Sequence, residues 1–171
     1  MSAKEKNRSE AFILKDLKLI ESNNNNEYFS VGLIDDDLYN WEIVIFGPKD
    51  TPFESGIFRA EMKFPIQYPD EPPTFKFLTP MWHPNIDKQG NVCISILHKS
   101  GYDNLEYEEL NERWMPVRSA ESVIMSIICL LNSPNCESSA NQDAGFQYRN
   151  SKDEYIKKVK SYTQKTLDDL L

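Results

Sequence analysis

The chain of 171 residues is long enough for one domain with a sizeable core, since 40% of its residues are hydrophobic and 12% are aromatic. It carries 27 acidic against 19 basic residues, and its net charge of −8 argues against nucleic acid as a partner, because phosphate binding needs a basic face. The amino end is polar and no apolar run reaches the roughly 18 residues of a membrane span. We therefore expect a cytoplasmic protein without a transmembrane segment.

The chain contains three cysteines, Cys93, Cys129 and Cys136, with neither a CxxC pair nor a Cys/His spacing typical of a zinc site. An odd number without paired spacing favours a reducing compartment and argues against a disulfide framework. The pattern predicts no metal site.

The first expected element is an amphipathic helix over residues 9–21, because Ile13, Leu17 and Ile20 recur at the i, i+4, i+7 spacing of one helix face. Four strand-like segments follow, separated by short connections rich in Asp, Gly and Pro. They cover residues 28–35, 40–47, 57–64 and 74–79. Because no helix intervenes between them, they predict an antiparallel meander.

The last third of the chain is expected to be helical. A helix over 119–132 has Ser119 or Ser122 as its cap, and Cys129 lies in its apolar run, so we expect this cysteine in the core. The buried stripe of this helix comprises Val123, Ile127, Leu130 and Leu131. A short helix is expected over 140–150, and a last one over 151–171.

The last helix begins with a capping box of Ser151 and Glu154. One face of it carries Tyr155, Val159, Tyr162 and Thr166. The elements together predict an α+β fold, a four-stranded antiparallel sheet with one helix before it and helices after it, in a single domain over residues 1–171.

Charge is distributed unevenly along the sequence. Basic residues gather near the amino end, among them Lys4, Lys6, Arg8 and Lys15. The segment Tyr102–Glu112 has five carboxylates and no basic residue, namely Asp103, Glu106, Glu108, Glu109 and Glu112. Each cluster is either a solvated face or a docking surface for an oppositely charged partner.

Cys93 lies just after a loop rich in turn-forming residues, which opens with His83, Pro84 and Asn85. Such loops place side chains for chemistry, whereas an isolated free cysteine is often a small buried hydrophobe. Spacing alone leaves both interpretations open. A cysteine nucleophile usually needs a general base, and His83 and His98 are the only two histidines.

Five motifs occur in the order typical of one enzyme family. They are YPDEPP at 68–73, HPNI at 83–86, Cys93 eight residues after Asn85, ERWMP at 112–116 and LLNSPN at 130–135. With this order and spacing, the chain resembles the ubiquitin-conjugating (E2) family over nearly its whole length. The resemblance implies the fold of that family and a cis peptide bond between Tyr68 and Pro69.

The resemblance also implies a chemistry for Cys93. The family's cysteine accepts the carboxy-terminal glycine of ubiquitin from an activating enzyme as a thioester, and passes it to a lysine or to a ligase cysteine. A thioester is already activated, so a strong base beside the cysteine is not needed. ATP is consumed by the upstream activating enzyme, and no cofactor is expected here.

Asn85 is then implied to stabilise the oxyanion formed as the amine attacks, or to shape the loop that does so. A purely structural turn residue is the alternative for Asn85. His83 is expected to support the loop by hydrogen bonds rather than to titrate. Ser138 stands where many relatives have an aspartate that orients the attacking lysine, so we expect it in the catalytic group without a charge of its own.

The resemblance places two partners on one surface. The basic residues of the first helix are expected to contact an activating enzyme. A RING-type ligase is expected to contact the same helix together with Tyr68, Asp70, Met115 and Pro116. Asp70 replaces a large apolar residue of many relatives, which suggests a restricted set of ligases.

Residues 98–113 resemble the acidic insertion of a long-loop subgroup, whose members build lysine-48-linked ubiquitin chains in endoplasmic-reticulum quality control or with cullin-type ligases. The insertion follows Cys93 directly, so its five carboxylates are expected to support the active site, and the protein could also act in the nucleus or at the endoplasmic-reticulum surface through a partner. Two alternatives remain open. The chain could serve another ubiquitin-like modifier, or it could be a non-catalytic scaffold, although scaffolds of this kind lack the cysteine.

Overall fold

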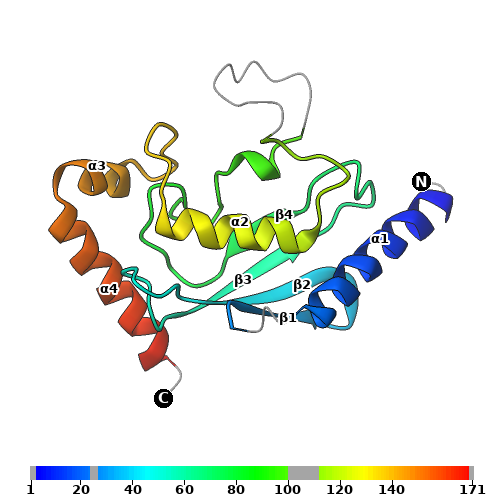
Figure 1. The fold of residues 1–171 in the computed structure, drawn as a ribbon, viewed down its shortest axis with the longest axis horizontal. Coiled ribbons are helices and arrows are strands. Elements are labelled where there is room, and N and C mark those ends of the chain that lie inside the picture. Colours follow the sequence, from blue (N-terminus) through cyan, green and yellow to red (C-terminus); the bar gives the residue numbers. More distant parts are fainter. Residues whose placement is uncertain (1–2, 24–26, 100–111, 170–171) are drawn as a thin grey trace.

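The computed structural model describes residues 3–23, 27–99 and 112–169. Figure 1 shows a sheet crossed on one face by helix α2, with α1 and α4 at its opposite ends. The elements in chain order are α1 (Ala3–Ser22), β1 (Phe29–Ile34), β2 (Asp37–Phe46), β3 (Ile57–Lys63), β4 (Thr74–Phe77), the 3₁₀ turn η1 (Ser95–Leu97), α2 (Ala120–Asn132), α3 (Gln142–Asn150) and α4 (Lys152–Asp168). This arrangement confirms the expected α+β fold.

The sheet is an antiparallel meander in the order β1-β2-β3-β4, as the sequence predicted. Buried and more exposed residues alternate along β3, β4 and the second half of β2, where Trp41, Ile43 and Ile45 are fully buried. Strand β2 begins three residues earlier than expected. Only Asp35 and Asp36 form the turn before it, and both have positive φ, the geometry of a tight two-residue hairpin.

Helix α1 begins six residues earlier than the apolar periodicity predicted. Its first turns are exposed and are held by good helix formers, with an i,i+4 contact of 3.8 Å between Lys6 and Glu10. Ile13 and Ile20 are buried as expected, whereas Leu17 is only half-buried.

Helix α2 confirms the expected stripe but corrects one residue. Ser119 is the N-cap, and it exchanges hydrogen bonds with Ser122 in a capping box. Cys129, however, is exposed, so the prediction of core packing was wrong. Successive helical residues are rotated by about 100°, so the buried neighbours Ile128 and Leu130 leave Cys129 on the outer face.

The two carboxy-terminal helices are separated by Ser151. It is the N-cap of α4 by position, but its side chain makes no capping bond, so the predicted capping box with Glu154 is wrong. Among the expected face residues, Tyr162 is only half-buried, and Thr163 fills the core position instead.

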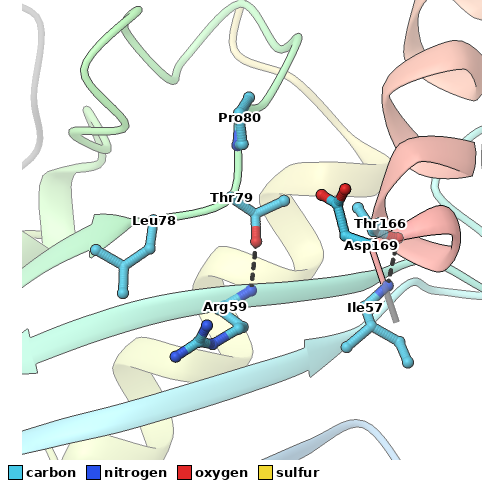
Figure 2. A pocket seen from close by; sticks show the side chains of 7 residues that line it. All are labelled: Ile57, Arg59, Leu78, Thr79, Pro80, Thr166 and Asp169. Atoms are coloured by element: carbon cyan, nitrogen blue, oxygen red, sulfur yellow. Dashed lines mark hydrogen bonds between the residues drawn. The ribbon is translucent and has the colours of Figure 1, made fainter. Parts of the chain in front are cut away.

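Two side-chain hydrogen bonds attach neighbouring segments to the start of β3, as Figure 2 shows. Ile57 N donates to Thr166 Oγ1 of α4 at 3.0 Å, and Arg59 N donates to Thr79 Oγ1 at 2.8 Å. They border a hollow of about 260 Å³ that contains none of the expected site residues. Within the described ranges, no helix has the length and apolar character needed to cross a membrane.

Candidate active site

A tight turn places Cys93 at the surface. Asp87 Oδ1 accepts hydrogen bonds from Gln89 N at 2.8 Å and Asn91 N at 2.9 Å. Gly90, at φ 91°, lies so close to β4 that a Cβ there would come within 2.0 Å of the carbonyl oxygen of Phe77. Glycine is therefore required at the turn, and the chain returns to a half-buried Cys93.

The loop between α2 and α3, residues 133–141, forms the opposite wall. Ser138 Oγ lies 3.8 Å from Cys93 Sγ, a sulfur–oxygen contact within reach of a weak hydrogen bond. Ser138 is exposed, so a group approaching the sulfur from solvent also meets this hydroxyl. The structure therefore brings together Cys93 and Ser138, which are 45 residues apart in the chain.

Asn85 connects the segment that contains Cys93 to the 133–141 loop. It is fully buried, and its backbone oxygen accepts a hydrogen bond from Cys93 N at 2.9 Å. Its side-chain amide donates to the carbonyl oxygens of Asn135, at 2.7 Å, and Ser138, at 2.9 Å. Its side-chain oxygen accepts from Asn135 N at 2.8 Å. Both amide hydrogens are thus engaged by the loop, which favours the loop-shaping role over the oxyanion role.

His83 supports the same loop and is fully buried. Its Nδ1 accepts a hydrogen bond from Asn85 N at 3.0 Å, and its Nε2 donates to the carbonyl oxygen of Leu130 at 2.9 Å. Burial lowers the pKa of His83 from its ordinary 6.5 to about 4, so the ring is neutral near pH 7. With both nitrogens engaged, His83 is not available as a base for Cys93.

The expected partner surface contains one correction. The Tyr68 side chain is 1% exposed, and its hydroxyl donates to Asp16 of α1, so the prediction that it contacts partners was wrong. Burial raises the pKa of both Tyr68 and Asp16. The cis bond between Tyr68 and Pro69 is present as expected, and Trp114 Nε1 donates to the carbonyl oxygen of Pro69 at 2.7 Å.

The other expected partner residues are accessible. Pro116 is exposed, Met115 is half-buried, and the next residue, Val117, is 85% exposed. Arg8 of α1 forms a two-contact ion pair with Asp70, and its hydrogen bond lowers the pKa of that carboxyl. The lysines of α1 that the sequence singled out, Lys4, Lys6 and Lys15, are exposed.

The two ends of the acidic insertion lie side by side. Lys99 pairs with Trp114 in a parallel β-bridge, and Trp114 N donates to the carbonyl oxygen of His98 at 3.0 Å. Glu112 is exposed near the returning end. The other four carboxylates, Asp103, Glu106, Glu108 and Glu109, lie outside the described residues.

Sequence reasoning missed two polar residues that position the site. Asp16 accepts a hydrogen bond from Ala120 N at 3.0 Å as well as the one from Tyr68, so it ties α1 to the start of α2. Asn141 caps α3 through Ala144 N, and its own N–H donates to Pro84 at 2.9 Å. An asparagine just before a helix is a recognisable cap, whereas nothing local marks Asp16 as buried.

Potential metal ligands are scattered over the fold. Within the described parts of the chain, no group of three or more His, Cys, Asp or Glu residues is arranged to hold a metal ion.

Comparison with known proteins places this geometry in a family. The family model described as "Ubiquitin-conjugating enzyme" matches residues 12–163. A probable ubiquitin-conjugating enzyme E2 7 of Caenorhabditis elegans is 48% identical over 142 residues, 82% of this chain and 87% of the relative. Ubiquitin-conjugating enzyme E2 15 of Schizosaccharomyces pombe is 45% identical over 161 residues, 94% of this chain and 96% of the relative. Ubiquitin-conjugating enzyme E2 7 of Arabidopsis thaliana is 48% identical over 139 residues, 81% of this chain and 84% of the relative. The chain therefore belongs to the ubiquitin-conjugating enzyme family.

Proposed function

We propose that Cys93 carries ubiquitin as a thioester between an activating enzyme and an acceptor lysine. The observation that carries the proposal is the half-buried sulfur of Cys93, 3.8 Å from Ser138 Oγ and flanked by a loop that Asn85 holds in place. As a transferase of this family, the chain has ubiquitin, activating enzymes and ligases as its general partners.

Loading exchanges one thioester for another. The sulfur of Cys93 attacks the carbonyl carbon of ubiquitin's last residue, a carbon–sulfur bond forms, and the bond to the activating enzyme's cysteine breaks. The proton of Cys93 ends on the departing thiolate. Since both sulfurs are similar leaving groups, the exchange is nearly balanced and needs no base of its own.

Transfer to lysine breaks the new bond. The neutral amine attacks the thioester carbon, a carbon–nitrogen bond forms, and the sulfur of Cys93 leaves and takes up the amine's proton. Ser138, exposed and 3.8 Å from the sulfur of Cys93, accepts a hydrogen bond from the incoming amine and orients it. Asn85 acts through the loop, because its amide fixes the backbone on either side of Cys136.

A neutral, fully engaged His83 is consistent with a carrier. A Cys–His pair would activate water as readily as an amine, and hydrolysis would discard the loaded ubiquitin. In this site both ring nitrogens of His83 are bonded to the backbone, and the ring is neutral near pH 7.

The first prediction tests Cys93. Incubation with activating enzyme, ATP and ubiquitin should produce an adduct that thiol reductants remove, and Cys93→Ala should abolish it. Cys129→Ser and Cys136→Ser are the matched controls and should keep the labile adduct. A reductant-sensitive adduct on the Cys93→Ala protein would refute the assignment, and parallel incubations with other ubiquitin-like modifiers test the choice of ubiquitin.

The acidic insertion over 98–113 supports a finer proposal, the building of lysine-48-linked ubiquitin chains alongside a RING-type ligase. Its carboxylates favour a cationic acceptor, and the bridge between Lys99 and Trp114 fixes where the insertion leaves the fold.

The second prediction follows from the charge of the insertion. Removing residues 100–111 should leave loading of Cys93 intact but slow chain formation. The difference from the intact protein should shrink as salt rises, because the Debye length falls from about 10 Å at 0.1 M to about 3 Å at 1 M. Chain-building rates measured across a salt series decide the matter. Equal rates for both proteins at every ionic strength would exclude a role for the insertion.

A further inference from the structure

Helix α3 carries an exposed aromatic residue that the chemistry at Cys93 leaves unexplained. Phe146 is 60% exposed, whereas its neighbours Ala144 and Gly145 in this nine-residue helix are buried. A single exposed apolar residue needs no explanation by itself. The position of this one, relative to the two walls of the active site, gives it a role.

Three contacts fix α3 against those walls. Asn141 N donates to the carbonyl oxygen of Pro84 at 2.9 Å, which joins the start of α3 to the loop that contains Asn85. A Cβ on Gly145 would lie 2.5 Å from Ser139 Oγ, so a larger residue there would force Ser139 of the 133–141 loop to shift. Arg149 Nη1 donates to the carbonyl oxygen of Cys136 at 2.9 Å, a second attachment to the same loop.

An ion pair joins α3 to the turn before Cys93. Asp143 lies 3.3 Å from Lys88 Nζ, and Lys88 belongs to the tight turn that delivers Cys93. With about 100° per residue, Phe146 lies on the helix surface between Asp143 and Arg149. Phe146 therefore lies on the exposed side of α3, between the two residues of this helix that contact the segments bordering Cys93, and Figure 1 shows α3 next to the 133–141 loop.

The surroundings of Phe146 are balanced in charge. Lys88 is paired with Asp143, and Arg149, the basic residue in the last turn of α3, donates to the backbone of the 133–141 loop. An apolar anchor with a polar, nearly neutral rim suits a protein surface with an apolar side chain of its own. Free lysine, by contrast, presents no folded protein surface for such an anchor to hold.

We propose that Phe146 anchors the acceptor ubiquitin when Cys93 builds ubiquitin chains. The inference rests on the proposed function of Cys93 and names the docking residue for its acceptor. Because the contact is apolar, it contributes to acceptor affinity rather than to the reactivity of the thioester, and its contribution depends little on salt.

The test separates acceptor binding from chemistry. Wild type and Phe146→Ala are loaded with ubiquitin, ATP is removed, and discharge is followed onto free lysine and onto a titrated acceptor ubiquitin with a blocked carboxyl terminus. Loading and discharge onto free lysine should be unchanged. The concentration of acceptor ubiquitin that gives half the maximal rate should rise on the order of tenfold, the scale of loss when one anchoring side chain is truncated.

Two further variants control the comparison. Phe146→Leu keeps an apolar side chain and should recover most of the affinity. Leu78→Ala truncates another exposed apolar residue, 46% exposed and in the hollow of Figure 2, and should match wild type in every assay.

Three results would overturn the inference. They are equal half-saturating concentrations for wild type and Phe146→Ala, an equal loss of discharge onto free lysine, and a defect that arises only when a ligase is added. Failure of the wild-type protein to form a labile adduct would instead remove the proposed function of Cys93, and the inference with it.

Discussion

Replacement of Asn85 by alanine separates the two roles proposed for this residue. In the structure its side chain makes three hydrogen bonds, two to carbonyl oxygens of the 133–141 loop and one from Asn135 N. The residue is fully buried, so water cannot take the place of the lost amide without rearrangement. Asn85→Ala therefore leaves two carbonyls and one N–H of that loop without partners.

The size of the effect follows from those bonds. At about 1 kcal/mol for each hydrogen bond, the free energy of unfolding should fall by about 3 kcal/mol. For a domain of this length, about 2–4 °C per kcal/mol converts the loss into a melting temperature lower by about 6–12 °C. Asn135→Ala is a matched control, because its exposed side chain accepts one bond, from Glu137 N at 3.0 Å, and should cost less than about 1 kcal/mol.

Two measurements decide between the roles. Thermal unfolding reports the loop contribution, and single-turnover discharge of loaded ubiquitin onto free lysine reports the chemistry. If Asn85 acts through the loop, Asn85→Ala lowers the melting temperature and slows discharge together, and Asn85→Asp is at least as unstable because its carboxylate faces two carbonyl oxygens. An unchanged melting temperature with intact loading and a loss in discharge of about a hundredfold would refute this reasoning and restore the oxyanion role.

Two further predictions concern ionisable groups. The pKa of His83 is about 4 in the folded protein against 6.5 ordinarily, so the unfolded chain binds the extra proton between these values. The free energy of unfolding should therefore be highest above pH 6.5 and fall by on the order of 3 kcal/mol towards pH 4, a slope that chemical denaturation of His83→Gln should lack. For the exposed pair of Arg8 and Asp70, Asp70→Asn should leave the melting temperature almost unchanged but alter the rate with a RING-type ligase, and a large drop in melting temperature with an unaltered ligase rate would contradict this expectation.

Much of the fold could be predicted because its pattern is local. Alternating apolar residues identified all four strands, and the observed bounds of β3 and β4 start where the pattern does. The errors occur where periodicity is absent or ambiguous. The polar start of α1 has no apolar stripe, a run of aspartates concealed the short turn before β2, and Cys129 shares its apolar run with residues of the opposite helix face.

The site was predictable to the extent that its residues lie in named motifs. The motif that contains Asn85 led to Cys93 and to the hydrogen-bonding role of His83, but spacing could not say which backbone groups the amide of Asn85 contacts. Tyr68 shows the limit of prediction from motifs. It belongs to a motif expected at the partner surface, yet its side chain is buried. Its partner, Asp16, is 52 residues away, and only the folded structure shows that the two meet.

Around Cys93, one set of residues fixes the structure of the site and another set selects the acceptor. Asn85 and His83 are buried and bonded to backbone, so they fix the two walls while offering no side-chain group to a particular acceptor. Selection must then come from exposed residues at the rim. The acidic insertion would attract the lysine's charge and weaken with salt, whereas Phe146 would bind an apolar surface and persist. If both act, raising the ionic strength should reduce the effect of deleting the insertion and leave the effect of Phe146→Ala in place.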